Sequence, residues 1–178
     1  MTEQQDIDPY NVLFLSTGNA GRSVMAAAIL NRQAGDRFRA YAAGTDPNGT
    51  VAPMALEVLS AEGFETEGLR FEPLSDFTGP DAPEMDFIFT LCDDAAGEDL
   101  PDWPGDPVTA HWGIEDPSKV DGSPIEKERA FETAFHYLRN RVLAFAALPL
   151  KTLDHLSLHS HLQAIGRQEG ASAASAAR

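Results

Sequence analysis

Cysteine is almost absent from this chain of 178 residues, because Cys92 is the only one. A single thiol excludes an internal disulfide framework and is typical of a protein in a reducing compartment. Long apolar runs are missing too, since no stretch approaches the ~20 residues that a membrane-spanning helix needs. The first ten residues, MTEQQDIDPY, are polar and acidic, unlike a signal or transit peptide. We therefore predict a cytoplasmic protein that does not enter a membrane.

Basic residues are also scarce, with 13 Lys and Arg against 28 Asp and Glu and a formal net charge of -15. Nucleic acids and anionic membrane surfaces are bound by clustered Lys and Arg, so this balance argues against both partners. A small anion is not excluded, because backbone dipoles act at short range. The chain length suits one compact core. We predict a flexible lead-in at 1–10, a single domain at 11–166 and a mobile tail at 167–178.

Short apolar runs alternate with helical patterns along the chain. VLFLS at 12–16 lacks polar alternation, which is typical of a strand covered on both faces in a parallel sheet. An Ala-rich helical stretch follows at 23–34. Strands that alternate with helices predict a three-layer α/β fold, with a central parallel sheet of about four strands and helices on both faces. Further strands are expected at 38–44, 85–92 and 107–112, and further helices at 52–63, 125–148 and 152–166.

The place of a ligand site follows from this arrangement. In a parallel sheet, ligands bind beyond the carboxyl ends of the strands. The loops after the first, third and fourth predicted strands, at 16–22, 92–105 and 111–123, are therefore expected to meet at one end of the sheet.

The segment STGNAGRS, which joins the first strand to the first helix, has the features of an anion-binding loop. Its glycines allow successive N–H groups to point inward, and the start of the helix adds partial positive charge. Arg22 adds a guanidinium that can contact two oxygens of a tetrahedral oxyanion. A plain strand-to-helix turn with a surface arginine explains this segment equally well on its own. The predicted oxyanion-binding residues are Ser16, Thr17, Gly18, Asn19, Ala20, Gly21, Arg22 and Ser23.

Several motifs in order identify a family resemblance. AYAAGTDP at 40–47, FIFTLCDDAAGEDLPDWPG at 87–105, TAHWGIEDPSKVDGS at 109–123 and ALPLKTLDHLSLHSHLQAIG at 147–166 accompany the loop. Together they resemble the low-molecular-weight tyrosine phosphatase superfamily, and more closely its thioredoxin-coupled arsenate reductases. The loop has the spacing of that family's Cys-x5-Arg-Ser motif, with Ser16 at the cysteine position.

The resemblance implies a low-molecular-weight phosphatase-like fold that holds phosphate, arsenate or a similar oxyanion in the loop. It implies that Ser16 occupies the nucleophile position and that Arg22 and Asp116 complete the catalytic set. Asp116 would be the general acid that protonates a leaving oxygen. Neither a metal nor another cofactor is implied, and the resemblance leaves room for a protein partner.

Two departures from the family pattern concern the chemistry. Active relatives attack the oxyanion with a cysteine thiolate, whereas a serine hydroxyl at position 16 stays protonated at neutral pH and needs a base. Cys92 matches the first of the reductases' later redox cysteines, but no second one stands near Asp99 or Leu100. One cysteine cannot complete an intramolecular relay. The resemblance therefore predicts an oxyanion-binding, arsenate reductase-like protein that is inactive or severely impaired as an enzyme.

The alternative interpretation is an active arsenate reductase or phosphatase. In that case the natural form has cysteine at position 16, and Ser16 is an engineered change that traps a ligand.

Histidines provide two weaker signals. His155, His159 and His161 lie close together in DHLSLHSH, but no acidic or cysteine partner has the spacing of a metal site, so we expect surface helix residues. His111 and Trp112 lie beside the expected site, where core packing and a direct role both remain open.

Overall fold

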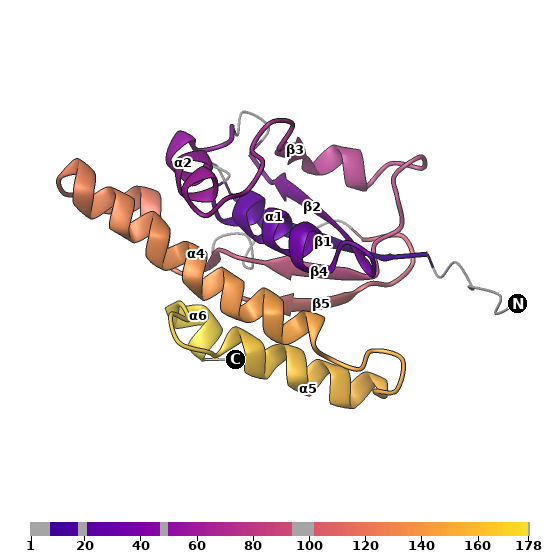
Figure 1. Cartoon of the computed structure of the whole chain (residues 1–178). Helices are drawn as coiled ribbons and strands as arrows, with labels where there is room; N and C mark the ends of the chain where they lie inside the picture. The colour runs from indigo at the N-terminus through magenta and orange to yellow at the C-terminus, as the bar shows by residue number, and fades with distance from the viewer. Residues whose placement is uncertain (1–7, 18–20, 47–49, 94–101, 178) are drawn as a thin grey trace, which may run out of the picture.

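A five-stranded parallel sheet forms the centre of the described fold, with strand order β3-β2-β1-β4-β5 (Figure 1). This architecture confirms the predicted α/β class, although the sheet has one strand more than expected. The additional strand, β3, pairs through only two residues at the edge of the sheet, which is too short to produce a periodic pattern in the sequence. The computed structural model describes residues 8–17, 21–46, 50–93 and 102–177.

Each predicted strand and helix is present, with ends that differ by a few residues. The strands are β1 Tyr10–Ser16, β2 Phe38–Gly44, β3 Glu72–Pro73, β4 Phe87–Thr90 and β5 Val108–His111. The α-helices are α1 Arg22–Ala34, α2 Pro53–Ala61, α4 Pro124–Ala146, α5 His155–Gly166 and α6 Ala173–Ala176, and the 3-10 helices are η1 Leu74–Phe77 and η2 Pro117–Lys119.

Strand β1 is buried on both of its faces. Val12 and Phe14 belong to the larger core cluster, which they share with α1 and α4. Leu13 and Leu15 belong to a smaller cluster on the other face, together with Phe77 of η1. Because both faces are covered, the strand has no need for polar residues, and this explains its uninterrupted apolar sequence.

The long helix α4 packs across one face of the sheet, beside α1 (Figure 1). Its Phe145 ring contacts Phe89 and Trp112 at centroid distances of 5.1 and 5.8 Å. Phe89 and Trp112 stack at 3.8 Å, and the Trp112 indole N–H donates to the Leu162 carbonyl at 2.9 Å. Trp112 is therefore a core residue that joins β5 to α5, which settles the packing role left open by the sequence.

A capping box starts α4. The Ser123 hydroxyl accepts from the Glu126 amide, and the Glu126 carboxylate accepts from the Ser123 amide at 2.6 Å. Pro124 occupies the first helical turn, where its missing N–H has no cost. This capping box fixes Pro124 as the first residue of α4, so the loop that carries Asp116 ends at Ser123.

The chain after α5 returns to the sheet. Ala171 forms an antiparallel bridge with Ile114, and the Ser172 amide donates to the Gly113 carbonyl at 2.9 Å. At the end of α5, a Cβ on Gly166 would lie 2.5 Å from the His111 carbonyl oxygen, so only glycine allows this approach. Residues 167–177, for which the sequence predicts a mobile tail, thus include α6 and contacts with the end of β5.

A buried arginine holds the turn at the start of this segment. Arg141 of α4 is fully buried, and its guanidinium donates to the carbonyls of Tyr137, Gln168 and Glu169, each at 3.1 Å. The helix and the turn are thereby joined through charge-assisted hydrogen bonds. Among the described residues, no helix combines the length and apolar character needed to cross a membrane.

We expect Arg141→Met to lower the free energy of unfolding by about 2–4 kcal/mol, because the carbonyls of Gln168 and Glu169 lose the donor that joins them to α4. Arg139→Met is the matched control, since Arg139 is exposed on the same helix, and it should change stability by less than about 0.5 kcal/mol. Urea unfolding followed by tryptophan fluorescence measures both. Equal effects would show that Arg141 does not anchor the turn.

Candidate oxyanion site

The carboxyl ends of β1, β4 and β5 meet on one side of the sheet, as the sequence predicts. Ser16 is the last residue of β1, Cys92 follows β4, and Asp116 follows β5. Arg22 opens α1 beside them. Four of the residues singled out in the sequence therefore lie around one end of the parallel sheet, where ligands of such folds bind.

The middle of the predicted loop is outside the described residues. This applies to Gly18, Asn19 and Ala20, and also to Asp99 and Leu100 of the segment after β4. Their predicted roles stay predictions. The described part of the site consists of the two ends of the loop and the side chains that face them.

Gly21 forms the N-terminal boundary of α1 and has a helical φ of -78°. Its small size matters for packing, because a Cβ there would lie 3.0 Å from the Phe131 ring of α4. The long helix can therefore approach the base of the loop closely.

The hydroxyl of Ser16 is fully buried and donates to Ser23 Oγ at 2.9 Å. Ser23 lies in the first turn of α1, so this bond connects the two ends of the loop. Among the described residues, no histidine or carboxylate is hydrogen-bonded to Ser16. The serine therefore has no base in contact that would activate it as a nucleophile.

Arg22 is buried and holds three chain segments together. Its Nη1 donates to the carbonyls of Ile114 at 2.9 Å and Leu91 at 3.4 Å, and its Nη2 lies 3.4 Å from Asp116 Oδ2. The other carboxylate oxygen of Asp116 accepts from the amide and the hydroxyl of Ser118, at 2.9 and 2.7 Å. The guanidinium plane is thus fixed beside the loop, and Asp116 balances its charge. The structure thus places Arg22 next to Asp116, for which the family resemblance implies the role of general acid.

Cys92 lies against the start of the loop. The Thr17 amide donates to Cys92 Sγ at 3.2 Å, and Thr17 Oγ1 lies 3.4 Å from the same sulfur. The sulfur is buried, with 4 % of the residue exposed, and Cys92 is a free thiol. The predicted redox-position residue is therefore in direct contact with the predicted oxyanion loop.

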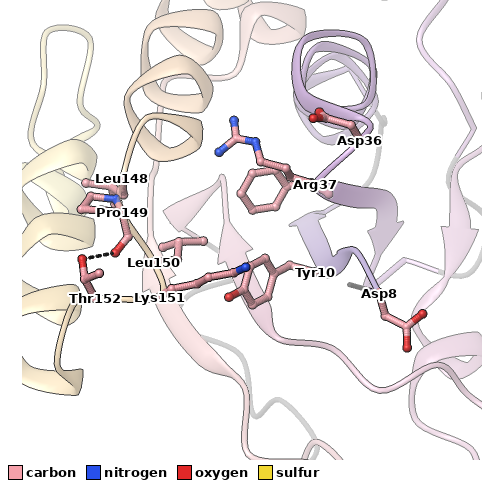
Figure 2. A pocket seen from close by; sticks show the side chains of 10 residues that line it. Asp8, Tyr10, Asp36, Arg37, Leu148, Pro149, Leu150, Lys151 and Thr152 are labelled. Atoms are coloured by element: carbon pink, nitrogen blue, oxygen red, sulfur yellow. Dashed lines mark hydrogen bonds between the residues drawn. The ribbon is translucent and has the colours of Figure 1, made fainter. Parts of the chain in front are cut away.

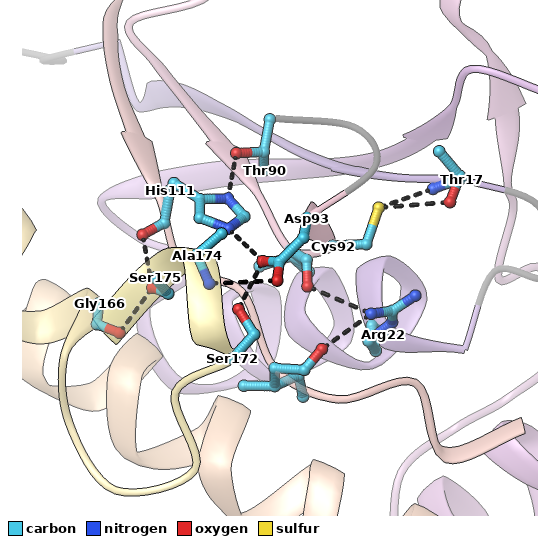
Figure 3. A network of polar contacts seen from close by, with 12 residues as sticks. Thr17, Arg22, Thr90, Cys92, Asp93, His111, Gly166, Ser172, Ala174 and Ser175 are labelled. Carbon is cyan, nitrogen blue, oxygen red and sulfur yellow. Dashed lines mark hydrogen bonds and ion pairs between the residues drawn. The ribbon is translucent and has the colours of Figure 1, made fainter. Parts of the chain in front are cut away.

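A polar network next to Cys92 was not predicted from the sequence (Figure 3). His111 Nε2 lies 2.8 Å from Asp93 Oδ1, and His111 Nδ1 lies 2.7 Å from Thr90 Oγ1. An ionised carboxylate only accepts hydrogen bonds, so Nε2 carries the proton in the bond to Asp93. His111 and Thr90 are register partners in β4 and β5, which places them side by side.

The C-terminal segment, residues 167–177, completes this network. Ser172 Oγ donates to Asp93 Oδ1 at 2.5 Å, and the Ala174 amide donates to Asp93 Oδ2 at 3.3 Å. Burial raises the pKa of Asp93, but the hydrogen bonds from Ser172, His111 and Ala174 outweigh burial and hold this pKa below its ordinary value of 3.8. Gly113 makes room for this network, because a Cβ there would clash with the side chains of Asp93, His111 and Ser172.

The sequence offers little signal for these residues. Asp93 belongs to the acidic run CDDAAGED, which has the composition of a solvated loop, and Ser172 belongs to a stretch of small residues. His111 was noticed only for its position. The contacts between these three residues span up to 79 residues of sequence, so only the folded chain reveals them.

The described structure contains several cavities. One, of about 290 Å³, lies at the amino ends of β1 and β2. Figure 2 shows the side chains of Lys151, Tyr10 and Arg37 around it, with Lys151 beside Tyr10. The Arg37 guanidinium donates to the Ala146 carbonyl. No residue of the predicted oxyanion loop lines this cavity. Another, of about 420 Å³, borders Asp116 between α4 and the C-terminal segment. Of these two, only the second adjoins the candidate site.

The C-terminal histidines lie on α5. The His155 and His159 rings are 5.2 Å apart, and His161 is exposed on the same helix. Within the described ranges, no group of three or more His, Cys, Asp or Glu residues is arranged to hold a metal ion.

The fold defines a class: an α/β protein with a parallel sheet, in which the central strand β1 is followed by α1 and a buried arginine opens that helix. The family model described as low molecular weight phosphotyrosine protein phosphatase matches residues 11–155, and the chain belongs to this family. Residues after 155, which include most of α5 and all of α6, lie beyond that match.

Similar proteins place the chain within the family. It is 33 % identical over 136 residues to an arsenate reductase of Bacillus licheniformis, covering 76 % of this chain and 94 % of that protein. An arsenate reductase of Bacillus subtilis is 32 % identical over the same coverage. A solved structure described as an arsenate reductase in the phosphate binding state has the same fold, with a TM-score of 0.62 and 23 % identity over 78 % of this chain and 97 % of that one.

The lowered pKa of Asp93 makes a prediction about stability and pH. A carboxyl group with a lower pKa in the folded than in the unfolded protein stabilises the fold above its unfolded pKa, and this contribution is lost as the pH falls through the folded pKa. Asp93→Asn should therefore be less stable than the parent near neutral pH, and the difference should narrow as the pH falls below about 4. Urea unfolding at a series of pH values measures this, with Asp121→Asn, an exposed carboxylate, as control. If the difference in stability between Asp93→Asn and the parent stayed constant or widened in acid, the lowered pKa of Asp93 in the folded protein would be contradicted.

Proposed function

We propose that this protein binds a tetrahedral oxyanion, phosphate or arsenate, in the loop formed by residues 16–23. The position of the Arg22 guanidinium supports this most directly. Its Nη1 donates to the carbonyls of Leu91 and Ile114, which hold it beside the loop, and its Nη2 faces Asp116. Arginine forms bidentate contacts with such anions. The start of the thirteen-residue helix α1 adds partial positive charge at the same place.

The ion pair with Asp116 has a direct consequence for binding. The pair keeps the buried guanidinium compensated while no anion is bound, since an isolated buried charge is costly. An oxyanion that enters the loop replaces Asp116 as the partner of Arg22 Nη2. Asp116 is then free to turn toward the 420 Å³ cavity that its side chain borders. The same carboxyl group, once protonated, is in place to donate to an oxygen of the ligand.

We propose further that the protein is severely impaired as an enzyme. The Ser16 hydroxyl has only Ser23 as its hydrogen-bond partner among the described residues, so nothing there removes its proton. Cys92 is the only cysteine of the chain, and a reductase relay needs further thiols. Binding needs neither group, which is why the loop retains a function without a thiolate.

The second candidate function is active catalysis in a form that carries cysteine at position 16. The Arg22–Asp116 pair favours it, because a binding protein does not need a general acid next to its arginine. The codon at position 16 in the natural gene distinguishes the two candidates.

The first test concerns Arg22. Arg22→Ala should weaken phosphate binding by about 2–5 kcal/mol, or at least about thirtyfold in Kd, because the anion loses its buried charge partner. Isothermal titration calorimetry with inorganic phosphate measures this. Arg22→Lys keeps the charge without the planar fork and should bind with intermediate affinity, and Arg39→Ala, an exposed arginine on β2, should bind like the parent. Equal phosphate affinity in Arg22→Ala and the parent would remove the basis of the proposal.

The second test concerns Ser16. Ser16→Cys should bind phosphate and arsenate more weakly wherever the thiol is ionised, since like charges ~4 Å apart repel by roughly 1 kcal/mol in water and more where solvent is thin. Calorimetry of both proteins between acid and neutral pH measures the difference. The same substitution should introduce at most weak phosphatase activity on an aryl phosphate, and Asp116→Asn should abolish it. Robust arsenate reduction by the parent with thioredoxin would contradict the proposed impairment.

A further inference from the structure

Asp93 is the point at which the C-terminal segment meets the candidate site. Its carboxylate accepts three hydrogen bonds, from His111, from the Ser172 hydroxyl and from the Ala174 amide (Figure 3). Two of these donors lie after residue 155, beyond the part of the chain that matches the family. Asp93 is therefore held by a part of this protein that its family match does not include.

The residues before Asp93 are tied to the oxyanion site. The Leu91 amide donates to the Leu15 carbonyl at 2.9 Å, and the Leu91 carbonyl accepts from the Ile114 amide at 3.1 Å and from Arg22. Cys92 then presents its sulfur to the Thr17 amide. The backbone between Leu91 and Asp93 is consequently fixed at both ends, and Cys92 lies between the two fixed points.

We propose that Asp93 is a positioning residue for the oxyanion loop, and that Ser172 and Ala174 of the C-terminal segment set its position. The segment holds Asp93, Asp93 holds the Cys92 sulfur against the Thr17 amide, and this contact keeps the start of the loop in its binding geometry. The inference rests on the proposed oxyanion function, which it deepens by adding a control of the same site from the C-terminus.

The segment has anchors that do not involve Asp93. The Ser175 hydroxyl donates to the carbonyls of His111 and Gly166, at 3.1 and 2.9 Å. Ser172 and Ser175 are both buried serines of the same short segment, and only Ser172 contacts Asp93. The chain therefore offers a matched pair of substitutions, Ser172→Ala and Ser175→Ala, that separates positioning of Asp93 from general attachment of the segment.

The experiment measures the reaction of Cys92 with a chromogenic aromatic disulfide in the full-length protein. Because Cys92 is the only cysteine and is buried, its rate of modification reports local opening at this point. Ser172→Ala should accelerate modification about tenfold, since it removes a hydrogen bond to a charged group. Ser175→Ala should leave the rate close to that of the parent, even where both variants lose similar thermal stability.

A second readout is the Kd for inorganic phosphate from calorimetry. Ser172→Ala and Asp93→Ala should bind several-fold more weakly than the parent, whereas Asp93→Asn, which keeps an acceptor oxygen for Ser172, should recover part of the loss. Ser175→Ala should bind like the parent.

The outcomes separate this inference from the function on which it rests. If the parent itself binds no phosphate, the proposed function fails, while a fast thiol reaction confined to Ser172→Ala and Asp93→Ala still supports the positioning role. If Ser172→Ala and Ser175→Ala change the thiol rate equally, or neither changes it, Asp93 does not position Cys92 and the inference is overturned. Altered thiol rates with unchanged phosphate affinity would overturn the link from Cys92 to the loop.

Discussion

The buried guanidinium of Arg22 is the interaction on which the site depends. It donates to the carbonyls of Leu91 and Ile114 and pairs with Asp116, so the first turn of α1 is joined to the chain after β4 and after β5. A buried cation needs compensation from every side, and loops from separate strands provide it here. The chain segments that follow β4 and β5 are thereby held against the start of α1.

The chemistry at the loop follows from what surrounds Ser16 and Cys92. Within the described part of the chain, the buried Ser16 hydroxyl has a single partner, Ser23, while Cys92, just after β4, presents its thiol to the Thr17 amide. A loop of this kind stabilises negative charge with amides and an arginine, and those groups work equally for a thiolate and for a bound oxyanion. In the function proposed above, serine at the loop's first position leaves this stabilisation to the ligand alone. That proposal dispenses with the family's thiol chemistry, and binding of an anion needs none of the missing thiols.

Much of the fold was predictable because its signals are local. The apolar run of β1 and the capping box at Ser123 each depend on a few neighbouring residues, and the structure contains a strand and a helix at these places. Arg22 and Asp116 were each singled out through motifs that resemble a known family, but the ion pair between them was not predicted. The edge strand β3 escaped prediction because two paired residues carry no periodicity.

The sequence by itself determined the α/β class, the order of the four longer strands, and the loop for which oxyanion binding is proposed. Those properties follow from hydrophobic period, turn residues and short motifs, which act over neighbouring positions. Only the tertiary structure decided that Asp93 meets His111 and Ser172, and that Cys92 lies against Thr17. These contacts depend on the register of β4 with β5 and on the path of the chain after α5. Both are fixed by packing between segments that are distant in sequence, and packing of that kind leaves no local pattern.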